Sequence, residues 1–404
     1  MLTARLYYAN SYVKEFSARV VSAAPLPTGN YAIILDRTVF YPESGGQPAD
    51  TGFLDTIPVL DVQEQSGDIV HITPSCPQQQ TVSGRINWQR RFDHMQQHSG
   101  EHVLTGACRQ IVKASNTGFH LGQVSSQIDL DIDVITDGQL AEIELVANTM
   151  VFNNVPFRIH MVTAEELSNF PLRKQPAKHY DSLRLIEVPD FDCCPCGGTH
   201  VNATGEIGLI KIRSWERKKN GIRLDFVCGH RALTDYQGKN EAVKDLAARL
   251  SVPPAELAAA YEKQADRLAA VSKELATARQ ELCCRLAQDL YAQAPETAGI
   301  KIITHTLANV LPAAVGELAR QLATYEYTVA LIAGVSPDNT KTHLVFAANP
   351  ALTPAFNMNT ALKAALPFLD GKGGGSPQLA QGGGAKPSGI PAGLTAAQKV
   401  LTGK

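Results

Sequence analysis

FDHMQQHSGEHVL, residues 92–104, is the stretch that decides how the rest of this chain is interpreted. Its His98 and His102 are four positions apart. On a helix, residues at that spacing project from one face, so the two ring nitrogens can meet at one point. A second stretch, CCPCGGTHV at residues 193–201, offers further side chains of the kind that bind metals.

Cys196 and His200 of the second stretch flank Gly197 and Gly198, which let the backbone curl so that both side chains converge. Three imidazoles and one thiolate suit Zn²⁺, which takes nitrogen and sulfur ligands in a tetrahedron. Each half alone is weak support for a metal. Together the two halves predict a zinc site whose ligands are His98, His102, Cys196 and His200.

Other interpretations of the same residues stay open. A histidine pair at this spacing is often only two surface or core side chains that are hydrogen-bonded and bind no metal. The zinc can also be structural, because four protein ligands close the tetrahedron whereas catalytic zinc usually keeps one position for water. Cys193 and Cys194 could compete as thiolate ligands, although the glycine turn follows Cys196 instead.

The five residues from His98 to His102 also match H-x-x-E-H, the signature of inverted zinc proteases, in which the glutamate acts as general base. So short a match tolerates chance. Those proteases recruit a downstream carboxylate as third ligand, whereas the obvious downstream partners here are Cys196 and His200. A zinc peptidase is therefore the second hypothesis for the function.

Composition and charge set wider limits. A chain of 404 residues is too long for one ordinary core, so we expect about two to four domains. The net charge of −2 gives no overall bias toward nucleic acid, so RNA contacts need local basic patches. The sequence shows no signal peptide and no bilayer-spanning run, and several of its eight cysteines cluster beside His200, which fits a reduced compartment. We therefore expect a cytoplasmic protein that does not bind membranes.

Patterns along the chain predict an α+β multidomain fold. A helix from about Arg91 to Val112 carries the histidine pair, strand-like FHLGQVSSQIDLDI follows, and Asp137 is expected to cap the next helix. Asn220-Gly221 between alternating apolar runs predicts a β-hairpin. The predicted domains are a small antiparallel β-barrel, an α+β zinc-binding core, a helical linker and a C-terminal α/β domain, at residues 1–90, 91–230, 231–294 and 295–404.

The predicted linker contains a coiled-coil-like seam. The helical pattern is interrupted at residues 251–254, and beyond this break apolar residues follow alternating steps of four and three, with one polar position. Either the linker packs on itself as a helical hairpin or the seam forms a homodimer. The seam residues are Leu257, Tyr261, Gln264, Leu268, Val271, Leu275, Ala278 and Leu282.

A glycine-rich run, DGKGGGSPQLAQGGG, occupies residues 370–384 of the C-terminal block. Such a run is usually a flexible linker. Because this one lies inside a predicted domain and precedes a predicted helix, we expect an ordered loop that presents backbone donors.

Several motifs together resemble one family. FYPESGGQPADTG at residues 40–52, the histidine helix, CGGTHV at 196–201 and TGEIGLIKI at 204–212 resemble the editing domain of alanyl-tRNA synthetase. They resemble the freestanding alanyl-tRNA editing proteins of the AlaX family even more. The run at 370–384 is similar to the glycine-rich motif of the tRNA-binding domain that ends alanyl-tRNA synthetase. In order along the chain, these matches make it similar to the long form of the AlaX family.

The resemblance implies a trans-acting hydrolase that deacylates wrongly charged tRNA(Ala), chiefly seryl-tRNA(Ala) and also glycyl-tRNA(Ala), with Zn²⁺ as cofactor. It carries over the zinc ligands His98, His102, Cys196 and His200, with both helix histidines taking part in catalysis. It carries no role for Glu101, which on a helix points about 100° away from each flanking ligand. It shows no counterpart of the aminoacylation domain, so activation of an amino acid with ATP is not expected.

Selecting serine over alanine requires a polar partner for the serine hydroxyl, and sites of this kind can discriminate by about 10⁴-fold or more. In the family such a side chain is implicated in the strand after the histidine helix, where Thr117 and His120 are the candidates here. An ordinary turn threonine and a satisfied histidine are equally open interpretations. The turn residues Gly45, Gly46 and Gln47 are expected to face the same cleft.

Candidate RNA contacts are local. Basic residues gather at the tip of the predicted hairpin and in a run at 173–178, and Lys372 and Lys386 flank the glycine-rich run, whose amides could hold phosphate. A charged hairpin tip is usually only solvated, so the patch alone is weak support. A third hypothesis is therefore a non-catalytic RNA-binding protein that zinc only stabilises. The hairpin residues are Arg213, Arg217, Lys218, Lys219 and Arg223, with Trp215 among them.

Overall fold

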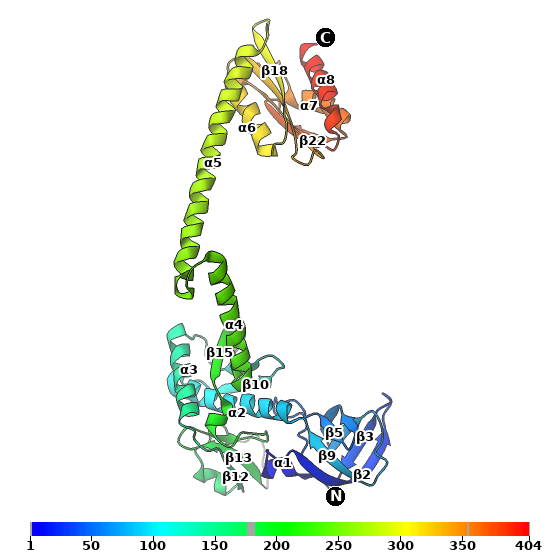
Figure 1. Cartoon of the computed structure of the whole chain (residues 1–404), viewed down its shortest axis with the longest axis vertical. Coiled ribbons are helices and arrows are strands. Elements are labelled where there is room, and N and C mark those ends of the chain that lie inside the picture. The colour runs from blue at the N-terminus through cyan, green and yellow to red at the C-terminus, as the bar shows by residue number, and fades with distance from the viewer. Residues whose placement is uncertain (1, 176–181, 354, 404) are drawn as a thin grey trace. The chain divides into compact units, whose positions relative to one another are not determined.

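The computed structural model describes residues 2–175, 182–353 and 355–403. The chain forms two compact units, Met1–Arg249 and Leu250–Lys404 (Figure 1). The predicted linker is divided between them, and the finer boundaries at residues 90, 230 and 294 stay predictions. Part of the basic run predicted at 173–178, namely 176–178, lies outside the described residues.

An antiparallel seven-stranded sheet begins the first unit, in the order β6-β5-β9-β2-β3-β8-β7. Apolar side chains such as Ile33, Leu35 and Phe40 fill its interior. The edge strand β6 also contacts β8, so the sheet is nearly closed, as expected for the predicted barrel. Its strands are β2 (Glu15–Pro25), β3 (Tyr31–Leu35), β5 (Gly52–Leu54), β6 (Ile57–Val59), β7 (Asp61–Gln65), β8 (Asp68–Thr73) and β9 (Thr81–Ile86). Beside it lie β1 (Ala4–Arg5), α1 (Leu6–Ala9) and β4 (Arg37–Thr38).

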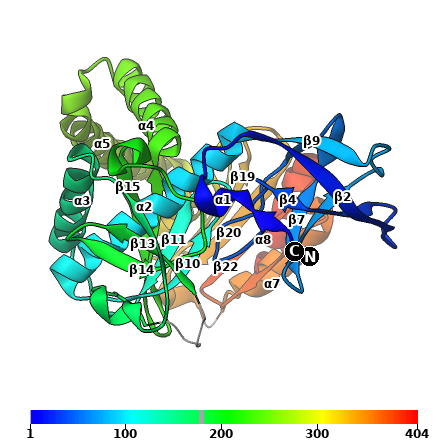
Figure 2. The same cartoon turned by 90° about the horizontal axis from the view of Figure 1, so that it is seen from below.

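Helix α2 (Trp88–Val112) leaves the barrel and packs against α3 (Asp137–Phe152), with the blue barrel strands toward its other end (Figures 1 and 2). Around it lie a four-stranded sheet, β10-β11-β16-β15, and a three-stranded sheet, β12-β13-β14. The strands are β10 (Asn116–Leu121), β11 (Ser126–Leu130), β12 (Arg158–Val162), β13 (Leu183–Val188), β14 (Asp192–Pro195), β15 (Ile210–Lys218) and β16 (Gly221–Cys228).

One local prediction in this region is refined and another is corrected. The strand-like stretch after α2 divides into the hairpin of β10 and β11, because the chain reverses at Gly122, whose amide donates to the carbonyl of Ser125. Helix α3 is capped by Thr136 rather than Asp137, since Thr136 and Gln139 form a reciprocal capping box. The hairpin predicted at Asn220-Gly221 is confirmed, with β15 and β16 paired on either side of it.

The second unit contains a six-stranded mixed sheet in the order β17-β18-β19-β20-β22-β21. Helix α6 and the end of α5 pack in one apolar cluster, and α7 and α8 pack in another. The strands are β17 (Glu296–Thr297), β18 (Ile300–Leu307), β19 (Thr328–Val335), β20 (Thr342–Ala348), β21 (Lys372–Gly375) and β22 (Leu379–Gly384). The helices are α5 (Leu257–Gln293), α6 (Pro312–Leu322), α7 (Met358–Ala365) and α8 (Ile390–Thr402), and α4 (Gly229–Leu250) precedes them.

The glycine-rich run is two paired strands, so the prediction of a loop is wrong. Strand β22 pairs with both β20 and β21, which commits many of its amides to the sheet. Glycine is needed here for close packing: a Cβ on Gly384 would lie 2.0 Å from the carbonyl oxygen of Leu369, and one on Gly373 would lie 2.4 Å from the Cα of Gly382.

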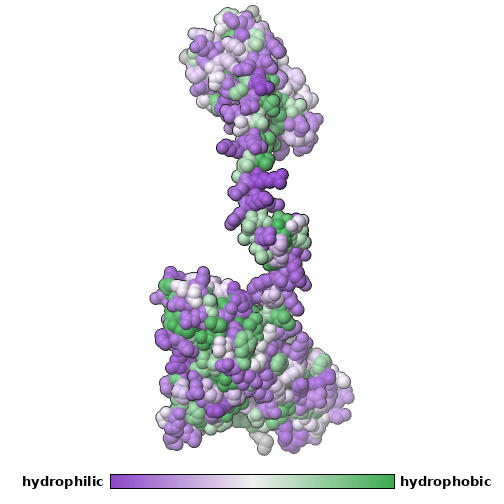
Figure 3. All heavy atoms as spheres, turned by 60° about the vertical axis from the view of Figure 1, so that its left-hand side comes forward, coloured by the Kyte–Doolittle hydropathy of each residue, from purple (hydrophilic) through white to green (hydrophobic). Residues whose placement is uncertain are grey.

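The predicted seam lies along α5, of which Ala287 is the one buried residue. Figure 3 shows the exposed part of this helix as mostly polar, with apolar patches between. Five of its apolar seam side chains are 49–71% exposed, so the second unit does not cover them; they are Tyr261, Leu268, Val271, Leu275 and Leu282. Among the described residues, no helix is both long and apolar enough to cross a membrane.

Candidate metal centre

Helix α2 is held in place by a buried ion pair at its start. The side chains of Arg91 and Asp50 are both fully buried, and Arg91 Nε lies 3.1 Å from each carboxylate oxygen of Asp50. Arg91 also donates to the carbonyls of Ser11 and Val39, at 2.9 and 2.6 Å. A buried charge requires such complete pairing. The pair therefore ties the first turn of the histidine helix to the barrel.

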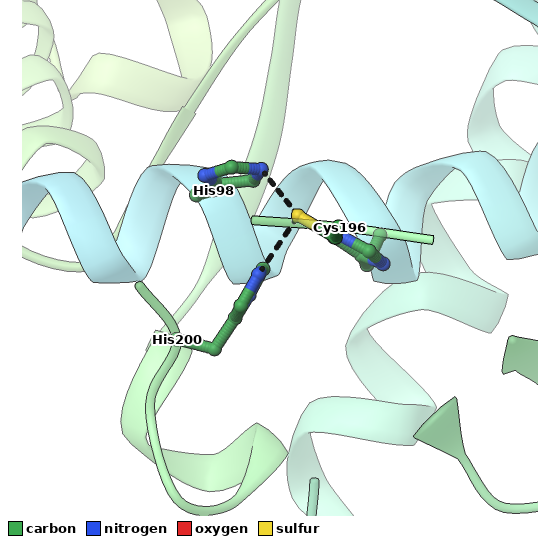
Figure 4. A group of neighbouring side chains, drawn as sticks. His98, Cys196 and His200 are labelled. Carbon is green, nitrogen blue, oxygen red and sulfur yellow. Dashed lines mark hydrogen bonds between the residues drawn. The ribbon is translucent and has the colours of Figure 1, made fainter. Parts of the chain in front are cut away.

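The structure brings together the four predicted ligands. One ligand atom from each of His98, His102, Cys196 and His200 lies within 4.8 Å of the other three. The Cys196 sulfur lies between two rings, 3.4 Å from Nε2 of His98 and 3.3 Å from Nε2 of His200 (Figure 4). The two distant segments of the sequence thus meet at one point.

Each histidine uses its Nδ1 for a hydrogen bond to the surrounding protein. The partners are Gln47 Oε1 for His98, at 2.9 Å, and Asp192 Oδ2 for His102, at 3.0 Å. The partner of His200 is Ser99 Oγ, at 3.2 Å.

These bonds prepare the rings for a metal. Gln47 Oε1 also accepts from the Thr199 amide at 3.2 Å, and its amide group donates to the Thr199 hydroxyl at 2.8 Å, which fixes Oε1 as the acceptor toward His98. A ring that donates through Nδ1 keeps a lone pair on Nε2, the nitrogen that faces the cluster. Three oriented imidazoles and a thiol fit a zinc ion.

Glycine at position 198 is required for close approach rather than for an unusual backbone angle. A Cβ on Gly198 would lie 2.1 Å from Cε1 of His98. Neither Gly197 nor Gly198 has a positive φ. The predicted backbone curl is thus not the reason for the glycines, since any side chain at 198 would push the second segment off the helix.

Charge at the centre favours a thiolate. Burial alone would raise the pKa of the Cys196 thiol, but the neighbouring His98 and His200 lower it well below its ordinary value. The Gly198 amide donates to the sulfur at 3.3 Å, which also stabilises the anion. Burial lowers the pKa of His200 to about 3, so this ring is neutral, as a ligand must be.

A cavity of about 690 Å³ opens beside this cluster and includes His98, His102 and Cys196 in its wall. Glu101 also lines it, contrary to the expectation that this side chain points away from the ligands. Its Oε2 lies 3.7 Å from Nε2 of His102. The expectation failed because Glu101 is three residues after His98 and so lies only about 60° from it around the helix, within the arc that lines the cavity.

Three residues that the sequence did not link to Glu101 hold its carboxylate. Its Oε1 accepts from Thr105 at 2.8 Å, from Asn116 at 2.6 Å and from Arg173 at 3.3 Å. Burial alone would raise the pKa of Glu101, but Arg173 and the nearby histidines lower it to about 2, so the group is ionised. The i, i+4 spacing of Glu101 and Thr105 could have indicated one of these contacts.

The other two cysteines lie outside the four-residue cluster. Cys194 Sγ lies 3.7 Å from Nδ1 of His102, the ring nitrogen that faces away from the four-residue cluster. His102, Asp192 and Cys194 form a second group that could bind a metal. Cys193 is buried in an apolar cluster with Val162 and Leu185. All eight cysteines, each among the described residues, are free of disulfide bonds.

Of the remaining predicted site residues, some line the cavity and others do not. Thr117 lines the cavity and donates to the Asp129 carbonyl at 3.2 Å. His120 is exposed and is not among the described residues that line the cavity. Gly45 lines the cavity, while Gly46 packs on Phe119 and Gln47 is buried beneath it. Gly45 and Gly46 have positive φ values, 59° and 83°, which glycine permits at a tight turn.

Most of the predicted basic hairpin is paired with acids. Lys218 pairs with Glu216, and Arg223 pairs with Asp129. Arg213 pairs with Asp225 and Asp235. Two cations remain without a recorded ion pair among the described residues, Arg217 and Lys219, and Arg217 donates to the Asp133 carbonyl. Lys372 is exposed on β21.

Fold and site together define a class: α+β proteins with a three-histidine, one-cysteine centre beside a cavity. Family models match at three places: "tRNA synthetases class II (A)" at residues 8–90, "Threonyl and Alanyl tRNA synthetase second additional domain" at 183–224, and "DHHA1 domain" at 299–403. The first match falls on the barrel, and the second includes Cys196 and His200.

Two relatives are informative over most of their length. The alanyl-tRNA editing protein Aarsd1-A of Xenopus laevis is 34% identical over 70% of this chain and 72% of its own. The alanyl-tRNA editing protein AlaX-L of Pyrococcus horikoshii is 29% identical over 94% of both chains. The chain belongs to the family of alanyl-tRNA editing proteins.

Other similarities cover only parts of longer or smaller proteins. The alanine–tRNA ligase of Pyrococcus furiosus is 34% identical over 74% of this chain, which spans 34% of the ligase. Among solved structures, the C-Ala domain of Aquifex aeolicus alanyl-tRNA synthetase matches 27% of this chain and 98% of its own, at 23% identity and a TM-score of 0.25.

Proposed function

We propose that this protein is a zinc-dependent aminoacyl-tRNA deacylase that acts in trans on mischarged tRNA(Ala). Its substrates would be chiefly seryl-tRNA(Ala), with glycyl-tRNA(Ala) as a second. The observation that carries the proposal is the ligand cluster, in which one atom from each of three histidines and one cysteine converge beside a cavity. Membership of the editing family supplies the substrate class.

The aminoacyl ester is an activated carbonyl, so the protein needs to place a water and stabilise the negative charge that develops on oxygen. When bound at His98, His102, Cys196 and His200, zinc supplies a Lewis acid for either task. The neighbouring residues are suited to positioning the water and recognising the substrate.

Glu101 is the one carboxylate among the described residues that line the cavity. Because Thr105, Asn116 and Arg173 hold its Oε1, its Oε2 is left to accept a hydrogen bond from a water in the cavity. We therefore give Glu101 the role of orienting that water. Arg173 lines the same cavity and provides a positive charge close to the reacting ester.

Discrimination against alanine is assigned to the polar wall of β10. The Thr117 hydroxyl donates to Asp129, which leaves its oxygen able to accept from the serine hydroxyl. Alanine has no hydroxyl to donate to that oxygen, so serine gains a hydrogen bond that alanine lacks. His120 stays a candidate for contact with the tRNA rather than with the amino acid, since it is exposed outside the cavity.

For tRNA binding we propose the exposed cations Arg217, Lys218, Lys219 and Lys372, with Gly45 at the cavity rim. For the homodimer we propose the exposed seam of α5, where a second copy would cover Leu268 and Leu275. The proposed compartment is the cytoplasm.

The test is a deacylation assay on seryl-tRNA(Ala) with zinc content measured on the same samples. Wild-type protein should carry about one zinc per chain and hydrolyse the ester. His102→Ala should lose both, while His160→Ala, a partly exposed histidine on β12, should lose neither. Circular dichroism of each variant controls for unfolding. Hydrolysis that persists in zinc-free His102→Ala would refute the proposal. Cleavage of peptides instead of the ester would support the peptidase, and tRNA binding without hydrolysis would support a structural zinc.

A further inference from the structure

A second cavity of about 690 Å³ lies in the same unit and has no part in the chemistry above. It adjoins the first through shared elements. Helix α2 contributes His98 to one cavity and His94 to the other, the turn after β4 contributes Gly45 and Pro48, and the start of the β10–β11 connection contributes Gly122. His94 lies one turn before the ligand His98, which is about 6 Å along the helix axis.

Two helices begin at this second cavity. The first residues of α2, Trp88 to Arg90, line it, and so do His230 and Arg231 at the start of α4. The first amides of a helix have no partner within the helix and carry partial positive charge. Asn87 caps only the Arg90 amide of α2. Neither helix has an acidic residue in its own first turn, and the Gly229 amide that begins α4 donates to the Leu209 carbonyl at 3.0 Å.

A buried histidine in the cavity wall lacks a partner. His94 is 3% exposed, and its Nδ1 makes no hydrogen bond to any described residue. Buried polar atoms are normally paired, so an unpaired one in a cavity wall indicates a missing ligand. Burial lowers the pKa of His94 to about 4; the charge of Arg90 also lowers it, while that of Asp93 raises it.

Cations outnumber anions at the cavity. Asp93 is neutralised by Arg231, whose Nε and Nη2 lie 2.8 and 2.6 Å from its two carboxylate oxygens. Arg90 donates through Nε to the Ala49 carbonyl at 3.0 Å and forms no ion pair with a described residue. Lys14 adds a charge nearby, 4.5 Å from the centroid of the Trp88 ring. The excess positive charge, with two helix N-termini, is the chemistry that binds phosphate.

From these contacts we infer that the second cavity binds a backbone phosphate of the RNA strand that enters the deacylation site, next to the aminoacylated 3′ nucleotide. This inference rests on the proposed function. A phosphate at Arg90 and the N-termini of α2 and α4 would lie about 12 Å from His98 along the helix axis, because Arg90 is eight residues before it. That distance is within reach of the nucleotide that precedes the terminal adenosine. It would thus fix the position of the ester along α2.

The test compares substrates with and without that phosphate. Seryl-tRNA(Ala) contains it, whereas 3′-O-seryl-adenosine does not. Arg90→Gln and His230→Gln should raise KM for the tRNA, by about tenfold for the arginine, with little change in kcat. Neither variant should change hydrolysis of the adenosine ester. Arg90→Lys should restore much of the loss, and Arg19→Gln, an exposed arginine on the barrel strand β2, serves as the control of equal charge.

A second measurement does not depend on catalysis. Fluorescence anisotropy with a short uncharged RNA ending in CCA should show weaker binding to Arg90→Gln, and the slope of log K against log salt should decrease by about 0.7. If wild-type protein binds this RNA but hydrolyses neither ester, the proposed function fails while the phosphate site stands.

Three results would overturn the inference. One is unchanged KM and unchanged salt slope in both variants. Another is equal loss on both ester substrates, since that would indicate a structural role for Arg90. The third is saturable binding of inorganic phosphate that Arg90→Gln abolishes while RNA binding stays intact, because the site would then belong to a free anion.

Discussion

Helices α2 and α5 show opposite uses of helical sequence. Of the 25 residues of α2, 16 are buried, and these include Arg91, His98, Glu101 and His102. Of the 37 residues of α5, only Ala287 is buried, while apolar side chains such as Leu268 and Leu275 are exposed. Polar residues are thus inside in one helix, and apolar residues are outside in the other.

The difference shows that burial follows from the partners available to a side chain and not from its polarity alone. Every polar group of α2 that enters the core needs a specific partner, because an unpaired buried group is costly. The exposed apolar seam of α5 has no partner among the described residues of its unit. Exposed apolar patches of this kind are typical of protein–protein interfaces. Four changes test this contrast, from the largest expected effect to the smallest.

Removal of the buried ion pair should have the largest effect. Asp50→Ala leaves Arg91 charged and buried without its carboxylate, which should lower the free energy of unfolding of the first unit by about 3–5 kcal/mol. Urea unfolding followed by tryptophan fluorescence measures this unit alone, because both tryptophans, Trp88 and Trp215, lie in it. On α5, Asp266→Ala should change stability by less than about 0.5 kcal/mol by circular dichroism. Equal effects of the two changes would remove the contrast.

Adding a methyl group should lower the stability of the protein on the buried surface of α2 and raise it on the exposed surface of α4. In Gly100→Ala the new Cβ would lie 2.2 Å from the Cys228 sulfur, so overpacking should destabilise by about 1–3 kcal/mol. In Gly238→Ala, on the exposed surface of α4, the Cβ meets nothing within 4 Å and should stabilise by about 0.5–1 kcal/mol. Thermal melting of both variants gives the sign, and stabilisation by Gly100→Ala would contradict the close packing of α2.

Loss of a hydrogen bond behind a ligand should weaken metal binding. Gln47→Met keeps the length of the side chain but removes the acceptor for His98, so zinc affinity should decrease by about 10–100-fold. Competition with a chromophoric chelator measures the affinity. Gln63→Met, on the exposed strand β7, is the matched control and should leave it unchanged. Unaltered affinity in Gln47→Met would mean that the barrel has no part in ordering the centre.

A change in the seam should have the smallest effect on the stability of the single chain. Leu275→Ala should alter the free energy of unfolding at low concentration by less than about 0.5 kcal/mol, because the side chain is 49% exposed. If the seam pairs two copies, sedimentation velocity should show a dimer in the wild type and a shift toward monomer in the variant. A wild-type monomer at all concentrations would leave the seam without the proposed partner.

Local and periodic signals were sufficient for much of the fold and for naming four side chains that lie together in the structure. The four-residue spacing of His98 and His102 and the adjacent Asn220-Gly221 depend on short-range geometry, which a sequence displays directly. The glycine-rich run at 370–384 misled because glycine favours loops in isolation, whereas here it permits close strand packing.

What the sequence could not provide are contacts across long separations. Gln47 reaches His98 and Thr199, which are 51 and 152 positions away. Arg173 meets Glu101 across 72 positions. No period or motif links such pairs, so the environment of the ligands had to come from the structure. For the same reason Glu101 was assigned no role, although its carboxylate lines the cavity.

The Gln47 side chain makes three pieces of chain thermodynamically interdependent: the barrel turn, helix α2 and the segment around Thr199. An ion held by His98 would favour the docked position of the barrel turn, and by reciprocity any force that undocks that turn would loosen the ion by the same factor. The metal content of this protein is therefore expected to depend on whether its N-terminal sheet is docked. A destabilising substitution far out in the barrel would then be detected first as a loss of bound zinc.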